Sequence, residues 1–298
     1  MANLKEVRTR INSVNSTMQI TSAMKMVSAS KLRKSQSAIT SLRPYASKLK
    51  EIMQDLSSSL LTSSESVYAK KHKDNAEDEK ILIIPVASNK GLCGIFNGNI
   101  IRETIRFVND ECRIQLEKGN VDILCISKKV EEALKFKKIT TIGNENSLLD
   151  NLSYDNILPF AERLMSDFSN EKYDRIIFIY NQFKNAGSQI MVHEQFLPIV
   201  SEESNDDNHS TSEIEYIFQP SKEEILNSLI PKSLKLQVYK ILLDSFTSEH
   251  GARMVSMTKA TDNASELLKE LNRSYNKARQ STITNEIIEI VSGADALS

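Results

Sequence analysis

The first ninety residues of the chain contain no glycine, and Pro44 and Pro85 are the only prolines among them. Apolar side chains recur there at alternating spacings of three and four residues, which is the period of a coiled-coil seam. They are Leu4, Val7, Ile11, Val14 and Met18, followed in the same register by Leu32, Ile39, Leu42, Ala46, Leu49, Met53, Leu56 and Leu60. We predict one long helix over residues 1–62. Because the ring of Pro44 clashes with the preceding turn, we expect a kink or an interruption there.

The C-terminal end repeats this pattern. No proline follows Lys232, and Gly251 and Gly293 are the only glycines beyond it. The same alternating spacing is seen at Met254, Met257, Thr261, Ala264, Leu268, Leu271, Tyr275, Ala278 and Thr282. We predict C-terminal helices over residues 221–298: a short helix capped at Ser221 and ended by Pro231, then a long one. Two long amphipathic helices bury their apolar stripes most simply by pairing with each other, as an antiparallel coiled coil.

The hydrophobic period changes in residues 78–200. Short apolar runs rich in Ile and Val, typical of strands buried on both faces, alternate there with helical patterns. The runs are 80–88, 121–127 and 174–180, and the helical patterns are 99–118, 128–136 and 156–168. This alternation predicts a Rossmann-like α/β domain with a largely parallel sheet. Residues 201–220 read as an acidic linker that leads to the C-terminal helices.

Charge and composition exclude several classes of protein. The net charge of −1 argues against a nucleic-acid binder, although residues 1–60 carry ten cations and three acids. Those cations are spread around the predicted helix, which disfavours direct binding to lipid or nucleic acid. No apolar run approaches the roughly 20 residues of a membrane span. The three cysteines form no CxxC pair, so neither a disulfide framework nor a zinc site is predicted.

The segment ASNKGLCGIFNG, at 87–98, lies where a phosphate-binding loop would lie, between a strand and a helix. Its glycines are spaced GxxGxxxG, which is neither GxGxxG nor GxxxxGK[ST], so a tight turn is the simpler interpretation. Cys93 has no base nearby in the sequence, and His193 begins HEQF rather than HExxH. We predict no catalytic residue, no cofactor and no metal.

Residues 20–29 invert the polarity of the N-terminal helix. Its seam positions become Thr21, Lys25 and Ser28. The flanks and back are apolar instead, with Ile20, Ala23, Met24, Met26, Val27 and Ala29. One partner helix cannot cover both sides. The stretch therefore packs on the chain's own α/β domain, or a second protein surrounds it and the methionines give an adaptable contact surface.

Four segments together resemble the gamma subunit of the F-type ATP synthase. They are KEVRTRINSVNSTMQITSAMKMVSASKLRKSQ (5–36), LRPYA (42–46), SNKGLCGIFN (88–97) and the long block from Ala252 to Leu297 that begins ARMVSMTKATDNASELL. The resemblance implies a non-catalytic rotor shaft. In that family the terminal helices form a coiled coil inside a ring of three alpha and three beta subunits, and proton flow through the c-ring turns the shaft and drives ATP synthesis.

The resemblance also implies which residues contact partners. The outward apolar residues Ile20 and Val27 would face the ring, and Met24, Lys25, Lys31 and Arg33 would face the moving lever of beta. Arg279, Gln280 and Thr284 would meet a loop of beta higher in the shaft. Ile287, Ile288 and Val291 would form the tip in an apolar bearing. The α/β domain would lie against the epsilon subunit and the c-ring, with one gamma copy per complex and no nucleic acid.

The family likeness places the protein at the cytoplasmic side of a bacterial inner membrane, as a peripheral subunit. The start at MANLKE favours a bacterial over an imported mitochondrial protein, and no cysteine-bearing insert of the chloroplast type is present. Ser88, Asn89 and Lys90 stand where the family often has an acid or an arginine, which puts ion pairing there in doubt. Two alternatives stay open: a nucleotide-dependent α/β enzyme and a plain coiled-coil scaffold.

Overall fold

The computed structural model of the chain describes residues 4–60, 68, 76–199 and 222–295. It divides into two compact units. The first unit contains the chain up to Ser30 and from Arg253 onward, and the second contains Lys31–Ala252. Helices α1 (Leu4–Leu60) and α6 (Lys222–Asp295) each contribute to both units. No helix among the described residues is both long enough and apolar enough to cross a membrane.

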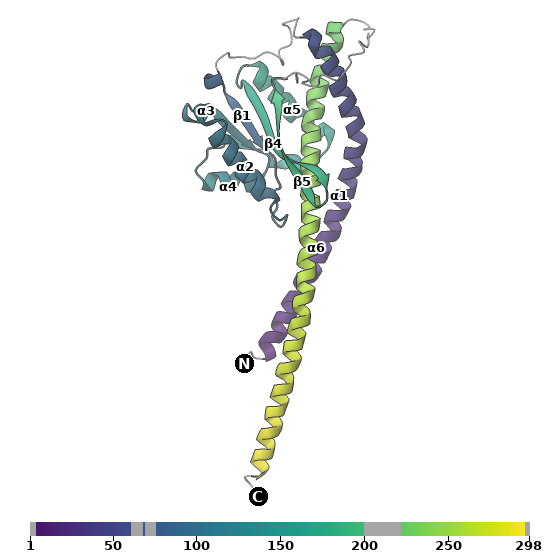
Figure 1. The fold of residues 1–298 in the computed structure, drawn as a ribbon, viewed down its shortest axis with the longest axis vertical. Coiled ribbons are helices and arrows are strands. Elements are labelled where there is room, and N and C mark those ends of the chain that lie inside the picture. The colour runs from purple at the N-terminus through teal and green to yellow at the C-terminus, as the bar shows by residue number, and fades with distance from the viewer. Residues whose placement is uncertain (1–3, 61–67, 69–75, 200–221, 296–298) are drawn as a thin grey trace, which may run out of the picture. The chain divides into compact units, whose positions relative to one another are not determined.

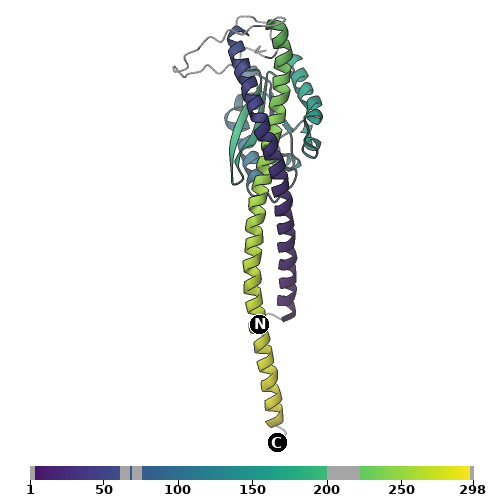
Figure 2. The same cartoon turned by 90° about the vertical axis from the view of Figure 1, so that its right-hand side faces the viewer.

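In the first unit α1 and α6 lie side by side and run in opposite directions (Figures 1 and 2). Their contact is the predicted seam. Val7, Met257 and Ala264 are buried in it. The remaining seam side chains are half-buried, namely Leu4, Ile11, Val14 and Met18 of α1 and Met254, Thr261, Leu268, Leu271, Tyr275 and Ala278 of α6. Thr282 is exposed, and α6 continues past the start of α1 (Figure 1).

The second unit is built on a five-stranded sheet in the order β3-β2-β1-β4-β5. The strands are β1 (Ile81–Pro85), β2 (Val121–Cys125), β3 (Gly143–Asn144), β4 (Arg175–Asn185) and β5 (Ser188–Leu197). Pairing is parallel from β3 through β4, and only β5 is antiparallel. The predicted α/β class with a largely parallel sheet is therefore confirmed.

The helices of this unit follow the expected alternation. They are α2 (Phe96–Asp110), α3 (Arg113–Glu117), α4 (Lys128–Phe136) and α5 (Tyr154–Ser169), with 3-10 turns η1 (Ala76–Asp78) and η2 (Asn146–Leu149). Ser127 begins α4 as an N-cap, since its hydroxyl accepts hydrogen bonds from the amides of Lys129 and Val130. The single helix predicted over 99–118 is two helices, because the chain leaves α2 at Glu111 and Cys112.

Two apolar cores cover the two faces of the sheet. Leu82 and Ile84 of β1 face one core, which also contains α5 and the α6 residues Leu234 and Val238. Ile81 and Ile83 face the other core, under α2 and α4. This alternation is the two-residue period of a strand with both faces buried. Helix α6 is thus part of the core of the second unit as well as one half of the helix pair in the first.

Neither proline stops its helix. Pro231 does not end a short helix, because α6 runs through it, and Ile230 and Leu234 beside it are buried in the core. Pro44 does not interrupt α1, where Ile39 and Leu49 are buried on either side. Tertiary packing of these neighbours outweighs the hydrogen bond that each proline removes, which costs about 3 kcal/mol. The predicted acidic linker over 201–220 lies outside the described residues.

Strands β4 and β5 form a hairpin that extends beyond the rest of the sheet. β1 pairs with Arg175–Ile179 of β4, and from Tyr180 onward β4 pairs only with β5. His193, the first residue of the HEQF sequence, lies within β5. We call residues 180–193 the overhanging hairpin.

Candidate partner-binding surfaces

The polar stretch of the α1 seam is paired with α6 by a hydrogen bond. The hydroxyl oxygens of Thr21 and Thr261 lie 2.9 Å apart, at the seam position of each helix. Each hydroxyl also lies within hydrogen-bonding distance of a carbonyl of its own helix, at Met18 and at Met257. The two threonines therefore satisfy each other's hydrogen-bonding groups at a position where apolar side chains would otherwise continue the seam.

The flanks of this stretch are open. Ile20 and Val27 are 60% and 58% exposed, and Met24 between them is half-buried. Their spacings of four and three residues place all three on one face of α1. Lys25, although at a seam position, is exposed, because its long side chain carries the ammonium out to solvent. The sequence-predicted apolar face thus exists, and α6 does not cover it within the first unit.

Two further cations predicted at this surface, Lys31 and Arg33, belong to the second unit and are exposed. Lys31 continues the face of Ile20 and Val27, four residues beyond the latter. Its Nζ lies 5.9 Å from the centroid of the Phe246 ring on α6, a cation–π geometry. This ammonium is therefore held partly by its own chain.

On α6 the three predicted polar contacts Arg279, Gln280 and Thr284 are all exposed. The Thr284 hydroxyl donates to the Gln280 carbonyl at 2.9 Å, so it is already satisfied within the helix. Its methyl group and the side chains of the other two residues remain available to a partner.

The last turns of α6 expose a row of large apolar side chains. The predicted Ile287, Ile288 and Val291 are 56%, 55% and 54% exposed. Two residues that sequence reasoning missed, Ile283 and Ile290, are exposed as well. The spacing 283, 287, 290, 291 places four of these side chains on one face, which could have revealed the missed pair. On a wheel of about 100° per residue this face lies roughly opposite the seam of Leu271, Tyr275 and Ala278.

These residues form two separate surfaces. Thr261 of α6 contacts Thr21, which lies within the α1 surface, so it shows where that surface lies along α6. Thr261 precedes Ile287 by 26 residues of the same helix. At about 1.5 Å per residue the separation along α6 is roughly 39 Å. The first surface is apolar with nearby cations, and the second is an apolar helix end.

The candidate nucleotide loop is closed by its own hydrogen bonds. The Ser127 hydroxyl donates to the Ser88 carbonyl at 2.7 Å, and the Ser88 amide donates to Asn97 Oδ1 at 3.0 Å. Helix α6 contacts the end of β1, where the Ser245 hydroxyl donates to the Val86 carbonyl at 3.3 Å. Open α/β sheets bind nucleotides at this edge, where the strand order reverses. Here a side chain of the protein's own helix reaches that edge.

The three cysteines lie in the interior of the second unit. Cys93, Cys112 and Cys125 are all buried. Burial raises the pKa of Cys112 to about 11 and that of Cys125 to about 12, so both are thiols at neutral pH. No group of three or more His, Cys, Asp or Glu side chains within the described residues could hold a metal ion.

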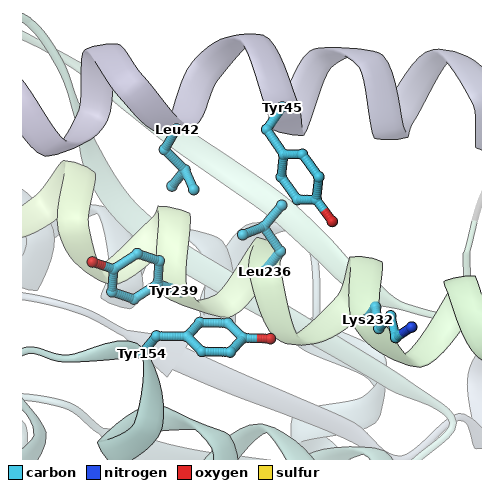
Figure 3. Close-up of a pocket in the computed structure, with 6 residues that line it drawn as sticks. All are labelled: Leu42, Tyr45, Tyr154, Lys232, Leu236 and Tyr239. Carbon is cyan, nitrogen blue, oxygen red and sulfur yellow. The ribbon is translucent and has the colours of Figure 1, made fainter.

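A groove of about 490 Å³ opens between α1, α5 and α6 in the second unit. Leu42 and Tyr45 point from α1 toward Leu236 of α6, and the rings of Tyr154 and Tyr239 meet edge to face at 5.7 Å (Figure 3). Among the described residues of its lining, Lys232 alone is charged.

Comparison with known proteins decides the family. A family model described as ATP synthase matches residues 3–297. The ATP synthase gamma chain of Christiangramia forsetii is 53% identical over 298 residues, which is all of both chains. This chain belongs to the ATP synthase gamma-chain family. Among its relatives, the gamma chain of Flavobacterium psychrophilum is 52% identical over all of this chain and 99% of its own length.

Solved structures agree with this gamma-chain fold. A chain of the central stalk and c-ring of the Tetrahymena thermophila mitochondrial ATP synthase is 25% identical and has a TM-score of 0.56, covering 81% of this chain and 99% of its own. A chain of the Euglena gracilis mitochondrial ATP synthase shares the fold with a TM-score of 0.66 at 19% identity, over 99% of this chain and 94% of its own.

Proposed function

We propose that this gamma chain is the rotor shaft in the central stalk of an F-type ATP synthase. Rotation of the c-ring, driven by proton flow, turns the shaft. The turning shaft takes three alpha and three beta subunits through the states of ATP synthesis, and it regulates proton flow and ATP hydrolysis. The gamma chain itself performs no catalysis. The likeness to a chain of the Tetrahymena central stalk, over nearly all of that chain, supports this assignment.

The observation that carries the proposal is the apolar exposure of both helices away from their seam. Ile20 and Val27 on α1, and Ile287 and Ile290 at the end of α6, are each more than half exposed. Exposed apolar surface of this kind marks a protein contact. Two faces directed away from a shared seam are best covered by a partner that surrounds the pair.

Each surface fits a distinct part of that partner. Ile20, Met24 and Val27, with the cations Lys25, Lys31 and Arg33, would face the moving lever of beta. Arg279, Gln280 and Thr284 would hydrogen-bond to a beta loop. Ile287, Ile288 and Val291 would turn within an apolar bearing. The α/β unit would contact epsilon and the c-ring, with one copy per complex on the cytoplasmic side of a bacterial inner membrane.

The enzyme alternative is less well supported. Polar groups of its candidate loop are already engaged in hydrogen bonds within the protein. In addition, Ser245 of α6 donates a hydrogen bond to the Val86 carbonyl, at the end of β1 where a nucleotide would bind. That alternative requires the purified chain to bind a nucleotide, with an affinity that falls when Gly91 or Gly94 is enlarged. We expect no nucleotide binding by the purified chain in calorimetric titration.

The test adds a cation to the α1 surface. In a complex reconstituted with this chain, Met24→Lys and Val27→Lys should lower ATP-driven proton pumping several-fold, because each places an ammonium against the surrounding subunits. Gln36→Lys, at an exposed position farther along α1, is the matched control and should pump normally. A plain scaffold would leave pumping unchanged in all three variants, and that result would refute the shaft assignment.

A further inference from the structure

Within the second unit the overhanging hairpin, residues 180–193, contacts α1, α6 and α2. It projects past β1, whose pairing with β4 ends at Ile179, so sheet formation alone does not explain its length. Its contacts with α1, α6 and α2 are short and directional.

Phe183 joins the hairpin to both long helices through its backbone. Its carbonyl accepts a hydrogen bond from Arg43 Nη2 of α1 at 3.3 Å. Its amide donates to the carboxylate of Asp244 on α6. The strand pairing shifts register between Phe183 and Asn185, so the ladder is irregular at this end of the hairpin. One residue therefore links α1 to α6.

Gly251 of α6 receives the turn of the hairpin. A Cβ built on Gly251 would lie 3.1 Å from the carbonyl oxygen of Ala186 and 3.3 Å from its Cα. These distances are shorter than ordinary carbon contacts, so a larger residue would push the turn away. Glycine also weakens a helix interior by about 1 kcal/mol relative to alanine, so its presence mid-helix points to this close approach.

The base of the hairpin is anchored on both sides. Glu194, next to it in β5, accepts hydrogen bonds from Tyr180 at 2.5 Å and from Gln237 of α6 at 2.9 Å. On the opposite side, Nε2 of His193 lies 3.1 Å from Oε1 of Glu103 on α2. The His193 ring also packs edge to face on the ring of Phe107. The hairpin is thus braced on α2 while it contacts α1 and α6.

Together these contacts resist one kind of motion. Apolar side chains packed along a helix oppose separation, but a turn of the helix about its own axis can exchange one apolar contact for another. Directional hydrogen bonds and a close backbone contact cannot be exchanged in this way. The next residue along a helix points in a direction about 100° away, so a rotating helix offers no equivalent partner nearby.

We infer that the overhanging hairpin is a torque strap, which fixes α1 and α6 to the α/β domain so that they turn together. Gly251 is the seat of the strap on α6, and Arg43 is its attachment on α1. The inference rests on the proposed rotor function, since only a rotating shaft loads this joint in torsion.

The experiment uses the complete complex with Gly251→Val or Arg43→Met in this chain. The strap predicts near-normal ATP hydrolysis with several-fold fewer protons pumped per ATP, because the helices slip against the domain. Gly98→Val is the matched glycine control, since its added Cβ would meet nothing within 4 Å. Arg163→Met removes a surface ion pair with Glu145 and is the matched arginine control.

The outcomes separate the two ideas. A normal number of protons pumped per ATP in both variants would overturn the strap. A fall of ATP hydrolysis and proton pumping in equal proportion would also overturn it, because that result indicates a role in folding only. If Gly251→Val fails to fold, Arg43→Met decides, because it adds no bulk. A wild-type complex that hydrolyses ATP without pumping would instead contradict the proposed function itself.

Discussion

Asp244 is a carboxyl group buried beside other charges. It is 2% exposed, and its Oδ1 has no hydrogen-bond partner among the described residues. Burial raises its pKa from 3.8 to about 6, against the opposing effects of Lys240, Arg43 and the Phe183 amide. The neighbouring carboxylate of Glu194 raises it further. The ionised form is therefore costly in the folded protein.

This cost predicts a pH-dependent stability. A carboxyl group with a raised folded pKa stabilises the fold when protonated, and that contribution disappears as pH rises from about 4 through about 6. Asp244→Asn, which stays neutral, should therefore stabilise the chain at pH 7.5 by up to about 3 kcal/mol. At pH 4.5 it should have little effect. Urea unfolding of both proteins at the two pH values measures this, and an equal effect at both would disprove the assignment.

Lys25 shows how a single residue limits prediction from sequence. Its position belongs to the seam, yet it is exposed. The heptad position determines the side of the helix on which a Cα lies. The four-carbon side chain of lysine is nevertheless long enough to bend away from the seam and place its ammonium group in solvent. Ser28 at the next seam position is buried, because its small side chain cannot do so.

At the scale of elements, the helix pair contains a polar contact that can be measured. The Thr21 and Thr261 hydroxyls lie 2.9 Å apart between α1 and α6. Thr21→Val and Thr261→Val should each lower stability, and the double variant should lose less than the sum. The expected coupling is about 1 kcal/mol, typical of one hydrogen bond. A double-mutant cycle by urea unfolding measures it, and strict additivity would exclude the contact.

The long helices and central strands could be predicted because their periods differ. Spacing of three and four gave α1 and α6, and runs such as 121–127 gave buried strands. The overhanging hairpin was not predicted, because residues 181–193 mix polar and apolar side chains and their longest apolar run, 190–192, is three residues. The continuity of α6 through Pro231 was also missed, since it depends on the burial of Ile230 and Leu234 against strands distant in sequence.

The partner-contacting residues could be foreseen only in part. An exposed apolar residue such as Ile20 is visible from the wheel of a helix, but its partner belongs to another chain. The family resemblance supplied that partner, and the exposed fractions are consistent with it. Ile283 and Ile290 follow from the helical spacing of this segment and not from the matched motif.

At the scale of the whole molecule, we expect some exposed apolar residues to serve assembly and not folding. Ile287→Ser and Ile290→Ser remove side chains that are 56% and 71% exposed. We expect the stability of the free chain to change by less than about 0.5 kcal/mol, as for most surface substitutions. The yield of assembled complex should fall, because the proposed bearing would lose an apolar contact.

The matched control for these variants is Leu271→Ser, a half-buried seam residue. It should destabilise the free chain by about 2 kcal/mol or more, because it removes apolar packing between the helices. Thermal unfolding of the free chain and gel filtration of the complex separate the two effects. Equal loss of free-chain stability in all variants would contradict the division of roles.

Helix α6 runs without a break from Lys222 to Asp295 and passes from one unit into the other. The number of residues in α6 therefore determines both how far along the helix axis a side chain lies and in which direction around the axis it points. One residue inserted near Arg253 would advance everything after it by about 1.5 Å and swing it by about 100°. In the proposed rotor, Ile287 and Ile290 would then face a different part of the surrounding subunits. An insertion of seven residues nearly restores the angle, so it should disturb the proposed coupling less than an insertion of one residue.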